Sequence, residues 1–167
     1  EDICAVIYNS NQHSSDYSSV GRIPRPSHAD FTAIMKYGKE VDLRGGGHYS
    51  GRLTAMMCIA GALSLQLLKE KGIDVFAHIY SVGKVKDTPF NLVKVGSEEK
   101  EALSAADFPV LNKASGEKKK EIIENARENS DSVGGIIECA ITGLPAGLGE
   151  HMFRGAEGVI SSIMFSI

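Results

Sequence analysis

Two short segments in the first third of the chain hold residues that could bind and protonate an anion. Residues 25–30 read Arg-Pro-Ser-His-Ala-Asp, and residues 42–54 read Asp-Leu-Arg-Gly-Gly-Gly-His-Tyr-Ser-Gly-Arg-Leu-Thr. Arginine pairs with phosphate and carboxylate, glycines let the backbone approach a ligand, and histidine changes its charge near neutral pH. Together they predict an anion site with acid-base capacity. A water-exposed histidine and a flexible surface loop are the open alternatives, since the Gly-Lys-Ser/Thr ending of a phosphate loop is missing.

Two helix starts are expected to position these residues. Ser27 and Asp30, three positions apart, form a capping-box pattern, which predicts a helix that begins at His28. Ser50 is the expected N-cap of a second helix, which includes Arg52. Because helix N-termini favour bound anions, we expect protonation of His28 to be linked to ligand binding.

The second helix is predicted to run through the long apolar stretch 53–68, which contains no charged residue. The charged residues 69–71 and then Gly72 indicate its C-terminal end. The stretch falls just short of the roughly 20 residues that cross a bilayer, and its small residues suit tight packing. We therefore expect a helix buried on nearly all sides.

The remaining elements are read from periodicity and turn residues. Strands are expected at 2–8, 73–82 and 133–142 with a further candidate at 91–95, and helices at 97–106, 116–129 and from 150 onward. His78 is expected on the more polar face of its strand, and the basic run 118–120 on a solvated helix face. Without a repeat or long linker, one α+β domain over residues 1–167 is predicted.

Composition excludes several classes of function. The chain has 167 residues, 43% apolar, with a net charge of −3 spread along its length, which argues against a nucleic-acid or membrane-surface partner. Cys4, Cys58 and Cys139 lack metal-ligand spacing, so we expect buried free thiols and no metal, with a catalytic cysteine as the weaker alternative. No secretory pattern is visible, and the expected location is cytoplasmic.

Four motifs, in order along the chain, resemble signatures of the chorismate synthase family. They are residues 25–30 with Lys36-Tyr37-Gly38, residues 42–54, Asp-Ser-Val-Gly-Gly at 131–135, and Gly-Leu-Pro-Ala-Gly-Leu-Gly-Glu at 143–150. Asn9, Gln12, Asp16 and Tyr17 also fit the segment before the first signature. The likeness spans essentially all 167 residues.

The resemblance implies a carbon–oxygen lyase of the shikimate pathway, which leads to the aromatic amino acids. Such an enzyme eliminates phosphate in an anti-1,4 sense from 5-enolpyruvylshikimate 3-phosphate and gives chorismate. It requires reduced FMN, with NADPH as a candidate reductant, although the reaction has no net redox change. The implied fold is a β-α-β sandwich with central helices between antiparallel sheets, and the implied assembly of the intact enzyme is a homotetramer.

The resemblance also assigns roles to residues of the first two motifs. It implies His28 as the catalytic residue beside the flavin; His28, His48, Tyr49 and Ser50 as cofactor-binding residues; and Arg25, Ser50 and Arg52 as substrate-binding residues. The chain departs from the family pattern at three positions, because His48, Tyr49 and Leu53 replace arginine, serine and glutamate. The missing glutamate would have completed a capping box with Ser50, so this helix start is expected to be less firmly fixed.

Family members are considerably longer than this chain. It lacks their N-terminal Gly-Glu-Ser-His-Gly signature with a second catalytic histidine, and their Ala-Val-Lys-Gly-Val-Glu signature. We therefore expect an internal, incomplete part of such an enzyme, inactive by itself. The alternatives are a catalytically inactive fragment that only binds phosphate or flavin weakly, and an unrelated phosphate-binding α+β protein.

Overall fold

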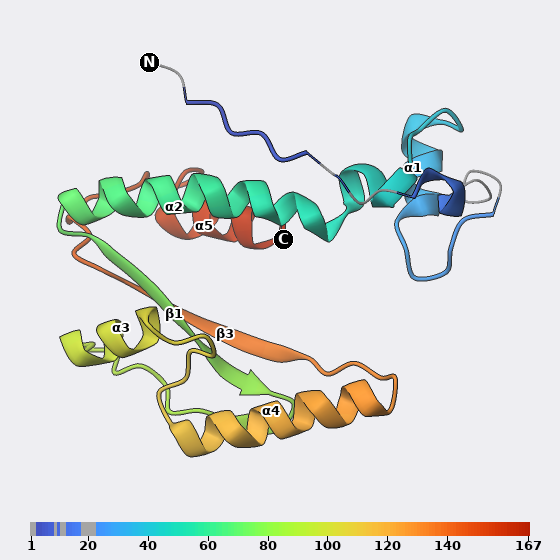
Figure 1. Ribbon diagram of the computed structural model, residues 1–167. Helices are drawn as coiled ribbons and strands as arrows, with labels where there is room; N and C mark the ends of the chain where they lie inside the picture. The colour runs from blue at the N-terminus through green and yellow to red at the C-terminus, as the bar shows by residue number, and fades with distance from the viewer. Residues whose placement is uncertain (1–2, 9, 11–12, 18–22) are drawn as a thin grey trace. The chain divides into compact units, whose positions relative to one another are not determined.

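Helices and strands are mixed along the computed structural model, which describes residues 3–8, 10, 13–17 and 23–167 (Figure 1). The α-helices are α1 Asp30–Tyr37, α2 Thr54–Glu70, α3 Ser97–Ser104, α4 Lys113–Glu128 and α5 Ala156–Met164, and the strands are β1 Asp74–Val82, β2 Val85–Lys86 and β3 Gly135–Thr142. Short 3-10 turns lie at Ser14–Tyr17, Arg44–Tyr49 and Gly51–Leu53.

The chain divides into two compact units, residues 1–64 with 149–167, and residues 65–148. The first unit contains a small apolar cluster in which Ala33 of α1 and Leu43 are buried. Tyr17, Ile34 and Val41 pack against this pair. The single domain expected over residues 1–167 stays a prediction.

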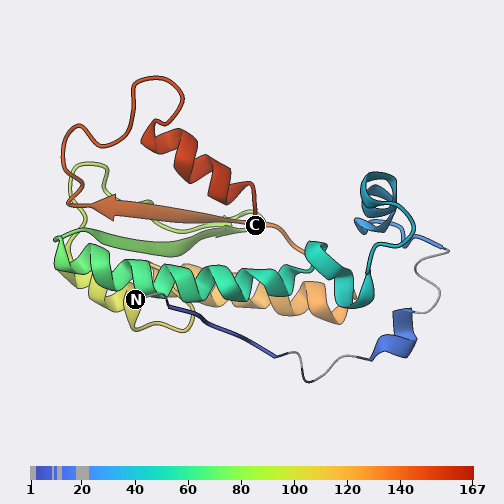
Figure 2. The ribbon, with the colours of Figure 1, turned by 90° about the horizontal axis from the view of Figure 1, so that it is seen from above.

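The second unit is built on an antiparallel sheet of strand order β2-β1-β3. The register of β1 and β3 runs from Asp74 opposite Thr142 to Val82 opposite Gly135, with an irregularity between Ile79 and Ser81. Figure 2 shows these two strands side by side. The strands expected at 73–82 and 133–142 are therefore confirmed to within about two residues, the usual uncertainty of element ends.

Helices α3 and α4 lie on the same side of this sheet (Figures 1 and 2). Phe76 of β1 is buried there with Phe90 and Leu103, and the two phenylalanine rings meet edge to face with centroids 5.3 Å apart. Because side chains alternate along a strand, the neighbours Val75 and Ala77 point to the opposite face, which stays partly open within the unit.

Helix α4 approaches its neighbours closely at one position. Gly116 is buried, and a Cβ atom at this residue would lie 2.8 Å from Cγ2 of Val110. The helix begins three residues earlier than expected, because the side chain of Asn112 accepts hydrogen bonds from the N–H groups of Ala114 and Ser115. A glycine inside this helix therefore has a packing role.

Helix α2 confirms the predicted helix but not its predicted burial. It follows the turn Gly51–Leu53 directly and ends where Gly72 adopts a φ of 73°. None of its residues is buried, and Leu67 is 62% exposed. An apolar helix is expected to pack against other elements on most of its sides, but its composition does not show which segment or chain those elements belong to.

The helical run Gly51–Glu70 has 20 residues and is long and apolar enough, by length and composition, to cross a membrane. Core helices of water-soluble proteins pass the same test. One such run is weak evidence by itself. The expected absence of a membrane partner therefore stays a prediction.

Two expected strands are absent from the described residues, and two further helices begin later than expected. Residues 3–8 form no strand, and residue 2 lies outside the described residues. Residues 91–95 form no strand either, because the Asn91 side chain accepts the N–H groups of Val93 and Lys94 and holds a turn. The last helix begins at 156 instead of 150, after a loop closed by a bond from the N–H of Glu150 to the carbonyl of Arg154. The first helix begins at Asp30 instead of His28.

The expected burial of the cysteines is also wrong. Cys4, Cys58 and Cys139 are free, but all three are exposed. Each lies in an apolar stretch whose own surface is left uncovered, as with α2. Apolar neighbours along the sequence are therefore a poor guide to thiol burial in this chain.

Candidate functional site

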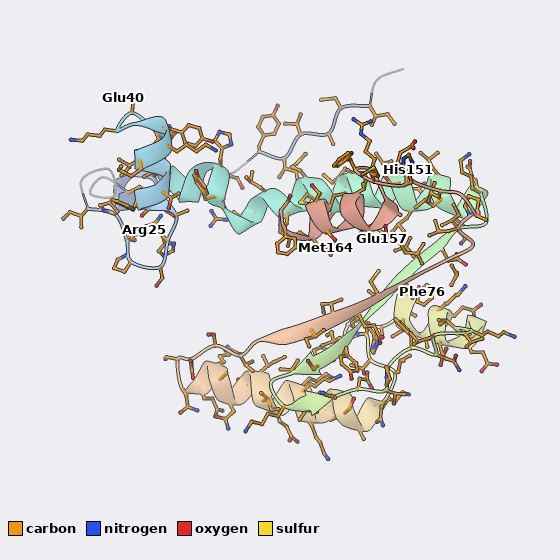
Figure 3. The ribbon with its side chains drawn as sticks, turned by 180° about the vertical axis from the view of Figure 1, so that it is seen from behind. Arg25, Glu40, Phe76, His151, Glu157 and Met164 are labelled. Carbon is orange, nitrogen blue, oxygen red and sulfur yellow. The ribbon has the colours of Figure 1, made fainter. Side chains whose placement is uncertain are left out.

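The entry to α1 is organised by a bidentate ion pair between Arg25 and Asp30. Nε and Nη2 of Arg25 donate to the two carboxylate oxygens of Asp30 at 2.8 and 2.9 Å, and the Arg25 backbone N–H donates at 3.0 Å. Figure 3 labels Arg25 in the segment that precedes α1. Ser27 has a left-handed φ of 61° and does not cap the helix. The predicted capping box is wrong, because the Asp30 carboxylate is already engaged by Arg25.

The ion pair fixes the charge of both partners. The side-chain hydrogen bonds from Arg25 lower the pKa of Asp30 to about 2, while burial opposes this shift and the Arg25 backbone N–H and positive charge reinforce it. The same pairing raises the pKa of Arg25. The guanidinium carries five N–H donors, and Asp30 uses those at Nε and Nη2, so Nη1 stays free of this pair. Arg25 could thus bind an anion through Nη1 while Nε and Nη2 stay paired with Asp30.

His28 is exposed in the turn before α1. Its backbone N–H donates to the carbonyl of Arg25 at 3.4 Å, and the helix begins two residues later. The capping-box pattern had predicted His28 in the first helical turn, but the residue lies before the helix. The catalytic and flavin-side role of His28 stays a prediction.

The glycine run forms a tight loop that only glycine can complete. Gly45, Gly46 and Gly47 have φ values of 63°, 90° and 53°. A Cβ atom at Gly47 would lie 2.4 Å from the carbonyl oxygen of Asp42, so the backbone approaches backbone here. Asp42 also binds Nε of Arg44 at 2.8 Å, and hydrogen bonds from the Arg44 side chain lower the pKa of Asp42 to about 2.

Ser50 caps the helical run that leads into α2, as predicted. Its side-chain oxygen accepts the backbone N–H of Arg52 at 3.3 Å. The Arg52 side chain is exposed, and its Nη1 lies 3.5 Å from the position of a Cβ atom at Gly45. Of the described residues, none forms an ion pair with Arg52, whereas Arg25 and Arg44 are both paired. Of the three arginines Arg25, Arg44 and Arg52, Arg52 is therefore the one most available to a ligand.

A cavity of about 640 Å³ brings Arg52 and Ser50 together. The rest of its lining is mainly apolar and includes Ile7, Tyr8, Leu53 and Met56. A ligand with an anionic group and a flat apolar part suits such a lining, since the cation and helix start would hold the charge.

A second cavity of about 740 Å³ adjoins the glycine loop and is more polar. His48 and Arg44 line it together with Tyr37 and Asp42, and Gly47 borders both cavities. The lining residues of the two cavities do not include Arg25, His28 or Tyr49. Ser50, Arg52 and His48 are thus predicted site residues that the structure places at a cavity, whereas Arg25, His28 and Tyr49 lie outside both.

Of the residues that fit the segment before the first signature, Tyr17 can be placed in this region. Its ring packs against the Ala33–Leu43 cluster and lies 5.7 Å from the Arg25 guanidinium carbon. Residues 9 and 12 lie outside the described residues, and the side chain of residue 16 is not described. In the described parts of the chain, no group of three His, Cys, Asp or Glu residues could hold a metal ion. The expected absence of a metal stays a prediction.

Sequence reasoning missed a buried polar network in the second unit. His78, expected on the more polar face, is 1% exposed and lies between the carboxylates of Asp87 and Glu138. Lys119, expected on a solvated face, is fully buried, and its ammonium donates to the carbonyl of Ile79 at 2.6 Å. Lys119 lies three residues after Gly116, on the same helix face, and this spacing is the signal that could have identified it.

Comparison with known proteins agrees with the motifs. The family model for chorismate synthase matches residues 1–167. The chorismate synthase of Lancefieldella parvula is 38% identical over 175 residues, which cover 99% of this chain and 46% of that protein. Those of Methanobrevibacter smithii and Korarchaeum cryptofilum are 38% and 39% identical, each over 99% of this chain and 44% or 45% of their own length. The chain thus spans less than half the length of these curated relatives.

A solved structure described as chorismate synthase is also similar. It aligns with a TM-score of 0.65 and 26% identity, over 83% of this chain and 43% of that one. The mixture of helices and antiparallel sheet, together with this likeness, confirms the expected α+β class. The chain belongs to the chorismate synthase family.

Proposed function

We propose that the protein containing this chain eliminates phosphate from 5-enolpyruvylshikimate 3-phosphate and forms chorismate, as a carbon–oxygen lyase of the shikimate pathway. The family match over residues 1–167 supports the reaction class. The observation that carries the proposal is the cavity in which Arg52, without an ion-pair partner among the described residues, adjoins Ser50 and the glycine loop.

The substrate has one phosphate and two carboxylates, so its site needs several cations and oriented N–H groups. Arg52 and the helix start capped by Ser50 supply both within one cavity. Arg25 keeps free donors at Nη1 while it is bound to Asp30. We assign Arg25, Ser50 and Arg52 to substrate binding.

The cofactor of the proposed reaction is reduced FMN, which supplies transient electron donation to the substrate when bound. The apolar lining of the Arg52 cavity suits a flat ring, and the cation beside it suits a phosphate. We assign His48, Tyr49 and Ser50 to flavin binding, and His28 to flavin binding and proton transfer. His28 and Tyr49 border neither cavity, so their assignment rests on the sequence motifs. NADPH is the proposed reductant.

The setting of the enzyme follows the family. We propose a cytoplasmic homotetramer without nucleic-acid or membrane partners. The alternative function is a catalytically inactive piece that binds phosphate or flavin weakly. It is favoured by one observation, that the chain spans only 44–46% of the relatives named above.

Phosphate release from 5-enolpyruvylshikimate 3-phosphate in the presence of reduced FMN tests the proposal. The assay compares residues 1–167 with the complete gene product. Release by the complete product alone supports the proposed activity and an inactive piece, whereas release by neither overturns the assignment.

A matched pair of arginine variants locates the site. Arg52→Ala in the complete product removes the free cation of the cavity, and a charged hydrogen bond of this kind contributes about 1.5–3 kcal/mol. We expect kcat/KM to fall by about tenfold to a hundredfold. Arg127→Ala removes an exposed arginine that pairs with Glu124 on α4, and should leave kcat/KM unchanged. Equal effects of both changes would exclude Arg52 from the site.

A further inference from the structure

The buried network of the second unit places one imidazole ring between two carboxylates. Nε2 of His78 lies 2.7 Å from Oε2 of Glu138 on β3, and Nδ1 lies 3.3 Å from Oδ2 of Asp87. The side chains of His78 and Asp87 are 0% exposed, and that of Glu138 is 28% exposed. The lining residues of the two cavities described above do not include these residues.

Asp87 is an acceptor at neutral pH. Its carboxylate receives the backbone N–H groups of Thr88, Leu111 and Asn112 at 2.8 to 2.9 Å, and the hydroxyl of Ser115 at 3.0 Å. Burial raises the pKa of this carboxyl, but the hydrogen bonds outweigh burial and the net pKa lies below its usual value. An ionised carboxylate can only accept hydrogen bonds, so Nδ1 of His78 must donate.

Glu138 is engaged in a similar way. Its Oε2 accepts the backbone N–H of Phe90 at 3.0 Å as well as facing the Nε2 of His78. If the ring were neutral and donated from Nδ1, the lone pair of Nε2 would face a carboxylate oxygen at 2.7 Å. With both carboxylates ionised, both ring nitrogens must therefore carry a proton for both contacts to be attractive.

The charge balance of the cluster leads to the same protonation state. Lys119 lies 3.5 Å from Oδ2 of Asp87 and contributes one positive charge. Asp87 and Glu138, when both are ionised, contribute two negative charges, which Lys119 and a protonated His78 balance together. Buried charges are costly unless they are paired, so the neutral cluster is favoured.

Other titratable groups near the ring do not change this balance. Tyr80 of the same strand contacts the ring edge to face with centroids 6.1 Å apart. From α3, Lys100 pairs with Asp74 at 3.1 Å, with its ammonium 5.2 Å from the centroid of the Phe76 ring. From α4, the charged group that faces the network is Lys119.

We propose that His78 is a buried imidazolium that acts as a pH-sensitive clamp between β1, β3 and the segment that follows β2. When the ring loses its second proton, the contact with Glu138 becomes repulsive. The Glu138 side chain then moves away from the ring, because it is partly exposed, whereas Asp87 is held in place by its other hydrogen-bond donors. The N–H of Phe90 then loses its acceptor, and Phe90, whose ring centroid lies 4.5 Å from that of His78, is loosened.

The direction of the pH dependence follows from proton uptake. The contact between Nε2 of His78 and Oε2 of Glu138 is attractive only while Nε2 carries a proton, and it exists only in the folded unit. Folding therefore binds a proton, so the stabilisation is present at mildly acidic pH and is lost as the pH rises. We expect the contact between His78 and Glu138 to be present at mildly acidic pH and to be lost at alkaline pH.

The test uses the full chain, labelled with ¹⁵N in its histidines, and the variant Glu138→Gln. At pH 7 we expect both ring nitrogens of His78 to show the ¹⁵N shifts of an imidazolium in the unsubstituted chain, and one neutral-type nitrogen in E138Q. Between pH 6 and 9, protection of the Phe90 amide against hydrogen exchange, corrected for the intrinsic rate, should fall by about tenfold in the unsubstituted chain and stay constant in E138Q.

The matched control is Glu117→Gln, which makes the same change in an exposed carboxylate that pairs with Lys120 on α4. E117Q should keep the imidazolium shifts and the pH dependence of the unsubstituted chain. A neutral His78 ring at pH 7 in the unsubstituted chain overturns the proposal, and this measurement does not depend on whether any variant folds. Phe90 protection that does not change with pH in the unsubstituted chain also overturns it.

Discussion

Replacing Asp30 by asparagine tests whether the ion pair with Arg25 stabilises the entry to α1. Asp30 is 3% exposed and accepts three hydrogen bonds from Arg25. The amide of asparagine has nearly the same size, but it carries no charge and offers only one oxygen acceptor. The variant therefore removes the bidentate pair with little change in packing.

The magnitude follows from the pKa of Asp30, which is lowered from 3.8 to about 2. A difference of about 1.8 pKa units corresponds to roughly 2.4 kcal/mol. The Arg25 side chain is 33% exposed, so water screens the pair and we expect about 1 to 2 kcal/mol. Because the folded-state pKa is lowered, this stabilisation is present above pH ~4 and is lost as the pH falls toward the folded value of about 2.

Amide hydrogen exchange of α1 is the suitable assay, because it reports local opening without assuming that the whole chain unfolds in one step. At neutral pH, protection of the amides of Asp30–Tyr37 should fall by about 5-fold to 30-fold in Asp30→Asn. Asp42→Asn is the control, since it makes the same change in an exposed pair with Arg44 and should leave α1 protected.

Two results would refute this account of the ion pair. The first is unchanged protection of α1 in D30N at neutral pH. The second is a ¹³C titration in which the Asp30 carboxyl behaves like an ordinary solvated aspartate. Either result would show that the contact with Arg25 contributes no stability, whatever its geometry.

Three further outcomes are expected. His28→Ala in the complete gene product should lower turnover by about 10²- to 10⁴-fold with an unchanged circular dichroism spectrum, the range of a positioned general acid, and unchanged turnover would remove it from the mechanism. Lys119→Met should destabilise the second unit by about 3 kcal/mol in urea unfolding, because it leaves Asp87 buried with one partner fewer. Gly47→Ala should destabilise the loop by about 1–3 kcal/mol and weaken phosphate binding measured by calorimetry, because its Cβ would collide with the carbonyl of Asp42.

Local signals in the sequence were sufficient for elements whose hydrogen bonds are local. The β-branched and aromatic residues of 73–82 indicated β1, and the uncharged run 53–68 indicated α2. Ser50 caps its turn as expected, since an N-cap needs only the N–H groups that follow it. The glycine run was predicted to let the backbone approach a ligand, and this stays a prediction; in the structure the group that Gly47 approaches is the carbonyl of Asp42.

Predictions failed where a side chain had a choice of partners. The Asp30 carboxylate could accept a hydrogen bond from the Ser27 backbone N–H or pair with Arg25. The sequence pattern favoured Ser27, which is nearer in sequence, whereas the bidentate pair with arginine is the stronger interaction. Lys119 resembled its two exposed neighbours until the helix face it shares with Gly116 was known. The aspartate that receives it, Asp87, lies 32 residues away, and separation of that kind is invisible to local patterns.

The missing side chain at Gly116 sets the depth to which α4 can approach. Val110 is β-branched and stiff, so a methyl group at Gly116, 2.8 Å from its Cγ2, would separate the two backbones. Lys119 lies three residues, less than one helical turn, after Gly116, and its ammonium donates to the carbonyl of Ile79 at 2.6 Å. Because Gly116 has no side chain, α4 can lie close enough to Val110 and β1 for the Lys119 ammonium to reach the buried carbonyl of Ile79.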